Sequence, residues 1–139
     1  MILLDTSGLL SALDASQRHH EECAALLAEA APPLLLSPFV LAELDYLLFR
    51  HVGQAAQSAL LEEVARGVYQ LEPLSAADVA RANAVIERYS QLDLGLADAS
   101  IVVLAERHAV SDVLTLDQRH FRALRIDRRK RFKVLPFDR

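Results

Sequence analysis

Short apolar runs alternate with longer segments of helical spacing along this chain. The short runs, each typical of a buried strand, are residues 2–5, 34–36, 68–71 and 113–117. The longer segments, which we predict to be helices, are residues 16–30, 38–50, 54–66, 75–89 and 96–108. Strands separated by helices favour a parallel sheet with helices on both faces, and such sheets bind ligands beyond the carboxyl ends of their strands. The pattern therefore predicts an α/β fold with its functional site at that edge.

Two of the predicted helices have recognisable starts. Ser37 is followed by Pro38, and a serine can cap the free N–H groups of a first turn in which proline is tolerated. Ser75 precedes its helical segment in the same way. We therefore expect helices to begin directly after both serines.

Size and composition indicate one packed domain that spans residues 1–139. The chain of 15.4 kDa is 53% hydrophobic and holds only four glycines, which excludes a disordered or low-complexity protein. No apolar stretch approaches the ~20 residues that span a bilayer, so we expect no membrane helix. The N-terminus lacks the basic segment and cleavage site of a signal peptide, and the single Cys23 permits no internal disulfide. These features predict a cytoplasmic protein.

Charge is distributed unevenly along the chain. Residues 118–139 hold nine of the fifteen lysines and arginines against two aspartates, so the net charge of −4 divides into +7 there and −11 before it. An acidic body with a basic terminal stretch suits a protein that holds cations in one place and phosphates nearby. A solvated helix face followed by a charged turn explains the basic stretch equally well.

Four acidic residues break or end apolar runs: Asp5, Glu43, Asp98 and Asp117. A lone carboxylate in apolar surroundings costs several kcal/mol of desolvation unless it is paired or bound to a cation. Mg²⁺ and Mn²⁺ prefer oxygen ligands, and no cysteine or histidine cluster accompanies these acids. The pattern therefore favours a divalent metal site with one or two ions.

Helical spacing predicts that Glu43 and Asp98 project from apolar faces. The residues one turn away from Glu43 are Phe39, Val40, Tyr46 and Leu47. The residues on the side of Asp98 are Ile101, Val102 and Ala105. Asp98 also lies in the first turn of its helix, where a carboxylate stabilises the helix dipole, so this second role stays open.

Four segments around these acids resemble the motifs of PIN-domain proteins and, more narrowly, of the VapC toxins of bacterial toxin-antitoxin pairs. They are Leu4-Asp5-Thr6-Ser7, Ser37-Pro38-Phe39-Val40-Leu41-Ala42-Glu43-Leu44, Leu94-Gly95-Leu96-Ala97-Asp98-Ala99 and Leu114-Thr115-Leu116-Asp117-Gln118-Arg119-His120-Phe121. The resemblance covers nearly the whole chain in order. It implies an α/β/α sandwich with a mainly parallel sheet of about five strands. It also implies a Mg²⁺- or Mn²⁺-dependent endoribonuclease, a homodimer and a small VapB-type antitoxin.

By this resemblance the four acids are the catalytic metal-binding residues. Asp5 and Asp98 are expected to bind the principal ion, and Asp117 to hold it or position the attacking water. Glu43 is expected to complete the site through water or a second ion.

The remaining site residues carried over by the resemblance are supporting ones. The hydroxyls of Thr6, Ser7 and Thr115 are expected to hold carboxylates or phosphate, although such residues at strand ends are often backbone caps. Asp93 is either an auxiliary acid or a solvated turn residue. Beyond Asp117, Arg119 and Arg122 are candidates for contact with the RNA backbone, and the expected substrate is structured RNA such as tRNA or an rRNA loop.

Alternatives remain at this stage. The chain could be a non-catalytic metal- or RNA-binding module, or a housekeeping RNA or DNA nuclease with the same site. His19 and His20, with the glutamates that follow them, fit a zinc site less well than a solvated face, because adjacent histidines point about 100° apart on a helix. Tyr46, Phe49 and Tyr69 suit stacking on bases less well than a core or dimer interface.

Overall fold

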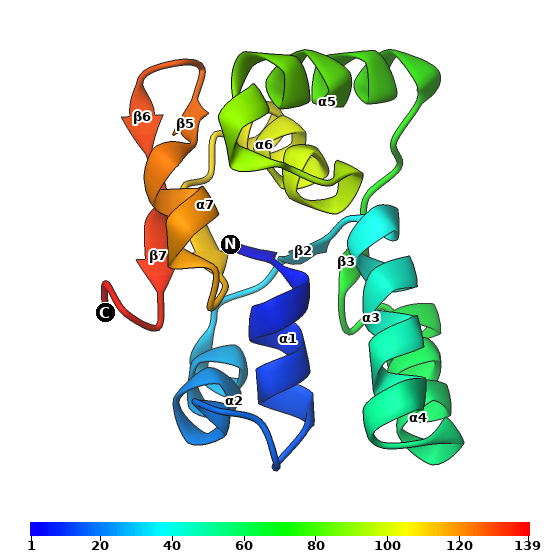
Figure 1. The fold of residues 1–139 in the computed structure, drawn as a ribbon. Coiled ribbons are helices and arrows are strands. Elements are labelled where there is room, and N and C mark those ends of the chain that lie inside the picture. Colours follow the sequence, from blue (N-terminus) through cyan, green and yellow to red (C-terminus); the bar gives the residue numbers. More distant parts are fainter.

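The computed structural model describes residues 1–139 as a three-layer α/β/α sandwich (Figure 1). The strands of the central sheet are β1 (Ile2–Leu4), β2 (Leu34–Leu36), β3 (Gln70–Leu71), β4 (Asp112–Leu114) and β7 (Lys133–Leu135). All neighbouring pairs are parallel and the strand order is β3-β2-β1-β4-β7. The predicted fold class, with about five parallel strands, is confirmed.

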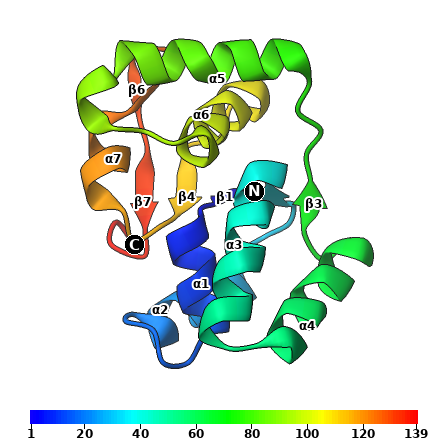
Figure 2. The same cartoon turned by 45° about the vertical axis from the view of Figure 1, so that its right-hand side comes forward.

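Seven α-helices surround this sheet. They are α1 (Thr6–Leu13), α2 (His20–Glu29), α3 (Pro38–His51), α4 (Gln54–Ala65), α5 (Ala76–Arg88), α6 (Leu96–His108) and α7 (Gln118–Ala123). Helices α1 and α2 pack together on one side of the sheet, and α5 and α6 pack together on the other (Figures 1 and 2). A short 3₁₀ helix, η1 (Ser90–Leu92), leads from α5 toward α6, and a small antiparallel hairpin of β5 (Arg125–Ile126) and β6 (Lys130–Arg131) precedes β7. None of the helices is long and apolar enough to cross a membrane.

The central strands are buried on both faces, which explains their continuous apolar sequences. Leu3, Leu4, Leu35, Leu36, Val113 and Leu114 all lie in one hydrophobic core. The two predicted serine caps are also confirmed. The Ser37 hydroxyl accepts the N–H of Phe39, and the Ser75 hydroxyl accepts the N–H of Asp78.

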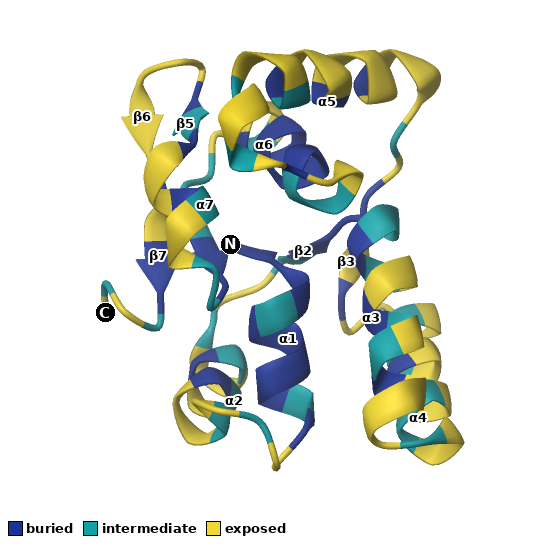
Figure 3. Ribbon diagram, in the orientation of Figure 1, coloured by how far each residue is buried: buried dark blue, intermediate teal, exposed yellow.

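Several elements differ from the sequence expectations. The strand predicted at 113–117 ends at Leu114, the strand predicted at 68–71 shortens to Gln70–Leu71, and the sequence pattern does not predict α1, α7 or β7. Helix α1 is buried on almost every side (Figure 3), and its eight residues include no charged side chain that would mark a solvent-exposed face. Helix α7 has only six residues, and β7 lies in the basic segment, whose many charges hide the apolar run of a strand.

Gly8 lets α1 lie close against β4. A Cβ atom at this position would be 2.4 Å from the carbonyl oxygen of Leu114, a distance that no real contact allows. The close approach places the first turn of α1 beside the carboxyl end of β4, where Thr115 and Asp117 follow.

Candidate metal centre

The candidate site lies beyond the carboxyl ends of β1 and β4. These two strands are neighbours, with Leu4 paired to Leu114. Asp5 follows β1 directly and Asp117 follows β4 by three residues, so both acids lie at the edge predicted from the sequence. Strands β2 and β3 extend the sheet on one side of β1, and β4 and β7 extend it on the other. A crevice forms where the direction of winding reverses in this way.

All four predicted acids line one cleft of about 320 Å³. Its lining consists of Asp5, Thr6, Ser7, Leu10, Glu43, Leu47, Asp98 and Asp117. The acids arrive there from four separate places: the end of β1, the middle of α3, the first turn of α6 and the residue before α7. The tertiary structure thus brings together side chains that are up to 112 positions apart in the numbering of the chain.

Asp5 is the most buried acid of the cleft, with 4% of its surface exposed. Its Oδ2 accepts hydrogen bonds from the hydroxyls of Thr115 at 2.6 Å and Ser7 at 3.2 Å. Burial raises the pKa of Asp5 to about 7, the Thr115 hydrogen bond opposes that rise, and the charge of Asp98 adds to it. The negative charge of Asp5 is therefore costly in the protein alone.

Ser7 and Thr115 are supporting hydroxyls, and each also holds the backbone that leads to Asp117. The N–H of Leu116 donates to the Ser7 hydroxyl at 2.9 Å, and the N–H of Asp117 donates to the Thr115 hydroxyl at 2.9 Å. The two roles considered for these residues, support of a carboxylate and capping of backbone, therefore coexist. The buried hydroxyl of Thr6 has no hydrogen-bond partner, although Thr6 lines the same cleft.

Asp98 caps its own helix and also lines the cleft. Its Oδ2 accepts the N–H of Gly95 at 3.3 Å, which caps the start of α6, and its side chain lines the cleft. Burial raises the pKa of Asp98, and the nearby carboxylates of Asp117 and Glu43 raise it further against the opposing effects of Gly95 and His120. Repulsion among these acids is what a bound cation would relieve.

Glu43 lies at the exposed rim of the cleft. Its predicted apolar surroundings are only partly present, because Val40 is buried whereas Tyr46 is 60% exposed. The start of its helix is tied to α6 through a 2.7 Å hydrogen bond between the hydroxyls of Ser37 and Ser100. This bond fixes the elements that carry Glu43 and Asp98 relative to one another.

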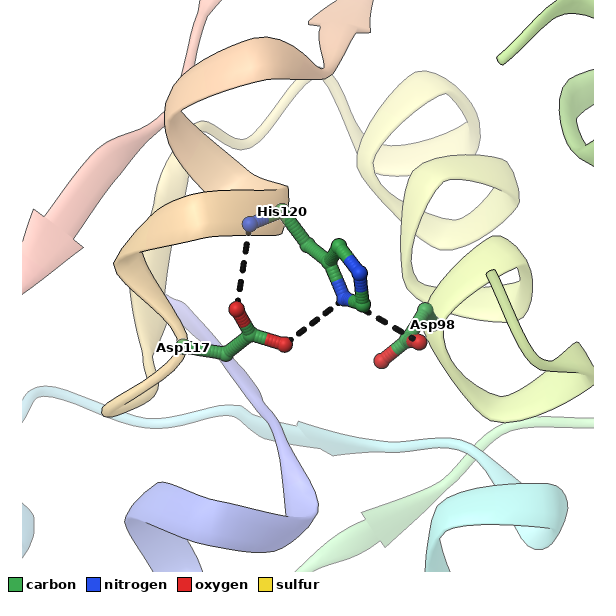
Figure 4. Close-up of side chains that lie close together, drawn as sticks. All are labelled: Asp98, Asp117 and His120. Carbon is green, nitrogen blue, oxygen red and sulfur yellow. Dashed lines mark hydrogen bonds and ion pairs between the residues drawn. The ribbon is translucent and has the colours of Figure 1, made fainter. Parts of the chain in front are cut away.

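His120 is the residue of the site that sequence reasoning did not assign. Its Nδ1 lies 2.7 Å from Oδ2 of Asp117 and 3.6 Å from Oδ2 of Asp98 (Figure 4). The backbone N–H of His120 also donates to Oδ1 of Asp117 at 3.0 Å. Ligand atoms of Asp98, Asp117 and His120 all lie within 4.8 Å of one another. The sequence feature that points to His120 is its spacing from Asp117, because residues three apart at the start of a helix lie on the same face.

The donor atoms suit a divalent ion. Carboxylate oxygens from Asp5, Asp98 and Asp117, with Glu43 at the rim, match the oxygen preference of Mg²⁺ and Mn²⁺. The raised pKa values of Asp5 and Asp98 show that the protein itself does not fully compensate these charges. These residues therefore fit a bound cation.

The other sequence candidates lie outside the cleft. Asp93 is exposed at the end of η1 in a left-handed backbone conformation, in agreement with its reading as a solvated turn residue. Arg119 is exposed on α7, whereas Arg122 forms a bidentate ion pair with Asp138 at 2.7 and 2.8 Å. The positive charge of Arg122 is thus partly neutralised within the protein.

The histidine and aromatic candidates also take ordinary structural positions. His19 contacts Glu22, whereas His20 contacts the carbonyl oxygen of Ser11, so the two rings serve different partners. Tyr69 is buried in the core, while Tyr46 and Phe49 are exposed on α3.

Comparison with known proteins agrees with this architecture. The model of the PIN domain family matches residues 2–127, and the chain therefore belongs to the PIN domain family. Ribonuclease VapC26 of Mycobacterium tuberculosis strain H37Rv is 41% identical over 135 residues, which cover 97% of this chain and all of that protein.

Two solved structures share the fold. Mycobacterium tuberculosis VapC20, described as a sarcin-ricin loop cleaving toxin, superposes with a TM-score of 0.78 at 23% identity, over 84% of this chain and 90% of its own. FitAcB from Neisseria gonorrhoeae superposes with a TM-score of 0.57 at 22% identity, over 85% of this chain and 88% of its own.

Proposed function

We propose that this protein is a metal-dependent endoribonuclease and the toxin of a VapBC-type toxin-antitoxin pair. The observation that carries the proposal is the convergence of Asp5, Glu43, Asp98 and Asp117 on one cleft beyond the carboxyl ends of β1 and β4. Full-length similarity at 41% identity to a protein named as a VapC ribonuclease supports the same activity. The proposed substrate is structured RNA, either tRNA or an rRNA loop, in the cytoplasm.

In this proposal the chain's residues hold and orient the ion, Mg²⁺ or Mn²⁺. A bound ion of this kind activates water for attack on phosphorus and stabilises the charge that develops on the phosphate. Asp5, Asp98 and Asp117 would bind it, while Glu43 at the rim would act through water or a second ion. The hydroxyls of Ser7 and Thr115 keep Oδ2 of Asp5 in place, and the N–H of His120 keeps the Asp117 carboxylate in place. Arg119, exposed just beyond Asp117, is the better candidate of the two arginines for contact with the RNA backbone.

The proposed partners are a VapB-type antitoxin and a second copy of the chain. Exposed apolar side chains on α3 and the segments around it support a protein-binding role for this part of the surface. They are Tyr46, Phe49, Val52 and Leu61. Large apolar side chains in contact with water are typical of such interfaces.

Brief expression of the protein in cells, followed by mapping of new RNA 5′ ends, tests the activity and finds the target together. We expect a few strong cleavage sites with 5′-phosphate ends in structured RNA, and their loss in Asp98→Asn. The purified protein should lose cleavage on addition of EDTA and regain it with Mn²⁺ or Mg²⁺. If Asp98→Asn folds normally and cleaves as fast as the wild type, the catalytic assignment is wrong.

The same experiment separates the alternatives. A non-catalytic module would yield no new 5′ ends, although chelation would still lower its melting temperature. A housekeeping nuclease would cleave without arresting growth, and antitoxin co-expression would leave its cleavage unchanged.

A further inference from the structure

The two ring nitrogens of His120 have different surroundings. Nε2 lies 2.6 Å from the backbone carbonyl oxygen of Leu92 in η1. A carbonyl oxygen only accepts hydrogen bonds, so Nε2 carries a proton, and an imidazole that binds a metal ion then does so as the neutral tautomer with no proton on Nδ1. In this tautomer the lone pair of Nδ1 points away from Leu92 toward Asp98 and Asp117 (Figure 4). Nδ1 is buried, and no partner meets it in hydrogen-bond geometry even though Asp117 is close.

The distances around Nδ1 suit a shared ion. Ligands on adjacent positions of an octahedral ion are about 3 Å apart, because each bond to the ion is about 2.1 Å long. The separations of Nδ1 from the carboxylate oxygens, 2.7 Å to Asp117 and 3.6 Å to Asp98, fall on either side of that value. Small side-chain rotations would bring the three atoms around one ion.

The ring is also held as metal-binding histidines usually are. Such residues donate their second ring N–H to a carboxylate or a backbone carbonyl, which fixes the tautomer and the ring orientation. The bond from Nε2 to Leu92 has this form. The following residue, Phe121, is fully buried and packs edge-to-face on Phe132, with the two ring centroids 5.3 Å apart. This contact anchors α7 directly beside the site.

We propose that Nδ1 of His120 is a direct ligand of the ion in the cleft, and that this nitrogen favours Mn²⁺ over Mg²⁺. The inference rests on the proposed metal site and adds a ligand that the acidic quartet does not contain. Mg²⁺ is bound in proteins mainly through carboxylates, phosphates and water, whereas transition-metal ions accept imidazole nitrogen readily. One nitrogen ligand among oxygen ligands therefore raises the affinity of the site for Mn²⁺ relative to its affinity for Mg²⁺.

Pulsed electron paramagnetic resonance on the full chain loaded with Mn²⁺ tests the bond directly. A coordinated imidazole produces ¹⁴N modulation of the electron spin echo. We expect this modulation in the wild type and in His51→Ala, a control that removes an exposed histidine at the end of α3. His120→Ala should lose the modulation while it still binds Mn²⁺. Absence of nitrogen modulation in the Mn²⁺-loaded wild type, or its persistence in His120→Ala, overturns the proposal.

Calorimetric titration with each ion tests the preference. His120→Asn keeps a polar side chain, and we expect its ratio of Mn²⁺ affinity to Mg²⁺ affinity to fall by about tenfold relative to the wild type. An equal loss of affinity for both ions would assign His120 a positioning role only and overturn the ligand assignment. Melting curves confirm that the variants are folded.

The two proposals fail in different ways. Wild-type protein that binds Mn²⁺ and cleaves RNA, but shows no nitrogen modulation, overturns the role of His120 and leaves the proposed function intact. Wild-type protein that binds neither ion overturns both.

Discussion

Asp5 shows at the scale of one residue why this cleft suits a cation. Its carboxyl group is almost entirely buried, and the hydroxyls of Ser7 and Thr115 that donate to its side chain carry no charge. No arginine or lysine lines the cleft beside it. A carboxylate in such surroundings is neutralised either by a proton or by a metal ion.

The raised pKa of Asp5 predicts how the stability of the metal-free protein depends on pH. Folding raises this pKa from 3.8 to about 7. Between these pH values the carboxyl group is therefore mostly protonated in the folded state and mostly ionised in the unfolded chain. The contribution of this group to stability is therefore full below pH 4, falls as pH rises toward 7, and amounts to about 4 kcal/mol at most.

Thermal unfolding of the EDTA-treated protein from pH 4 to 8 measures this effect. Asp5→Asn keeps an oxygen that accepts the Thr115 hydrogen bond but cannot ionise. We expect the melting temperature of this variant, relative to the wild type, to increase with pH up to about 7. If the difference in melting temperature between Asp5→Asn and the wild type does not vary with pH, burial does not raise the pKa of Asp5.

At the scale of elements, the close approach of α1 to β4 shapes one wall of the cleft. Thr6, Ser7 and Leu10 of α1 line the cleft, and Ser7 also holds the backbone after β4. Gly8 makes this approach possible, since a side chain there would meet the Leu114 carbonyl group. The position of α1 therefore determines the hydrogen bonds that support Asp5.

Gly8→Ala should move α1 away from β4. The backbone of Leu114 cannot yield as a flexible side chain would, so we expect a loss of about 1–3 kcal/mol in the free energy of unfolding and a marked loss of RNA cleavage. Chemical denaturation and a cleavage assay measure the two effects. Gly95→Ala is the control, because its new methyl group would enter open space with φ below zero, and we expect it to lose only the smaller free energy by which alanine is worse than glycine at the N-cap of α6. Equal effects of the two substitutions would contradict the proposed packing role of Gly8.

At the scale of the whole molecule, one ion would join four distant segments of the chain. The acids come from the end of β1, from α3, from α6 and from the segment between β4 and α7, and the repulsion among them opposes folding. A ligand that binds only the folded state stabilises it by about 2.7 kcal/mol at one hundred times its Kd.

Addition of saturating Mn²⁺ should therefore raise the melting temperature by roughly 5 to 10 °C, and EDTA should reverse the shift. Differential scanning fluorimetry measures the change. We expect Asp98→Asn to show little or none of the shift, while Asp93→Asn, which lies outside the cleft, should keep it. An undiminished shift in Asp98→Asn would place the ion elsewhere.

The sequence alone determined the fold class and the acids of the site. Leucine-rich strands buried on both faces have continuous apolar sequences, and a carboxylate that interrupts such a run is visible because its burial costs energy. Asp5, Asp98 and Asp117 could be found in this way, and the family motifs added weight to all four acids. Helices with a polar face or a serine cap were also predictable, as α3 and α5 illustrate.

Only the tertiary structure decided what depends on contacts between distant segments. Helix α1 is short and has no charged residue, so its sequence pattern does not reveal it. The need for glycine at position 8 arises from a strand more than one hundred residues away. The charge of Arg122 is balanced by Asp138, and the Nδ1 atom of His120 is directed at two carboxylates by the carbonyl group of Leu92. Sequence patterns record the local preferences of the backbone and the average burial of a segment. The direction of one ring nitrogen depends instead on which atoms surround it after folding.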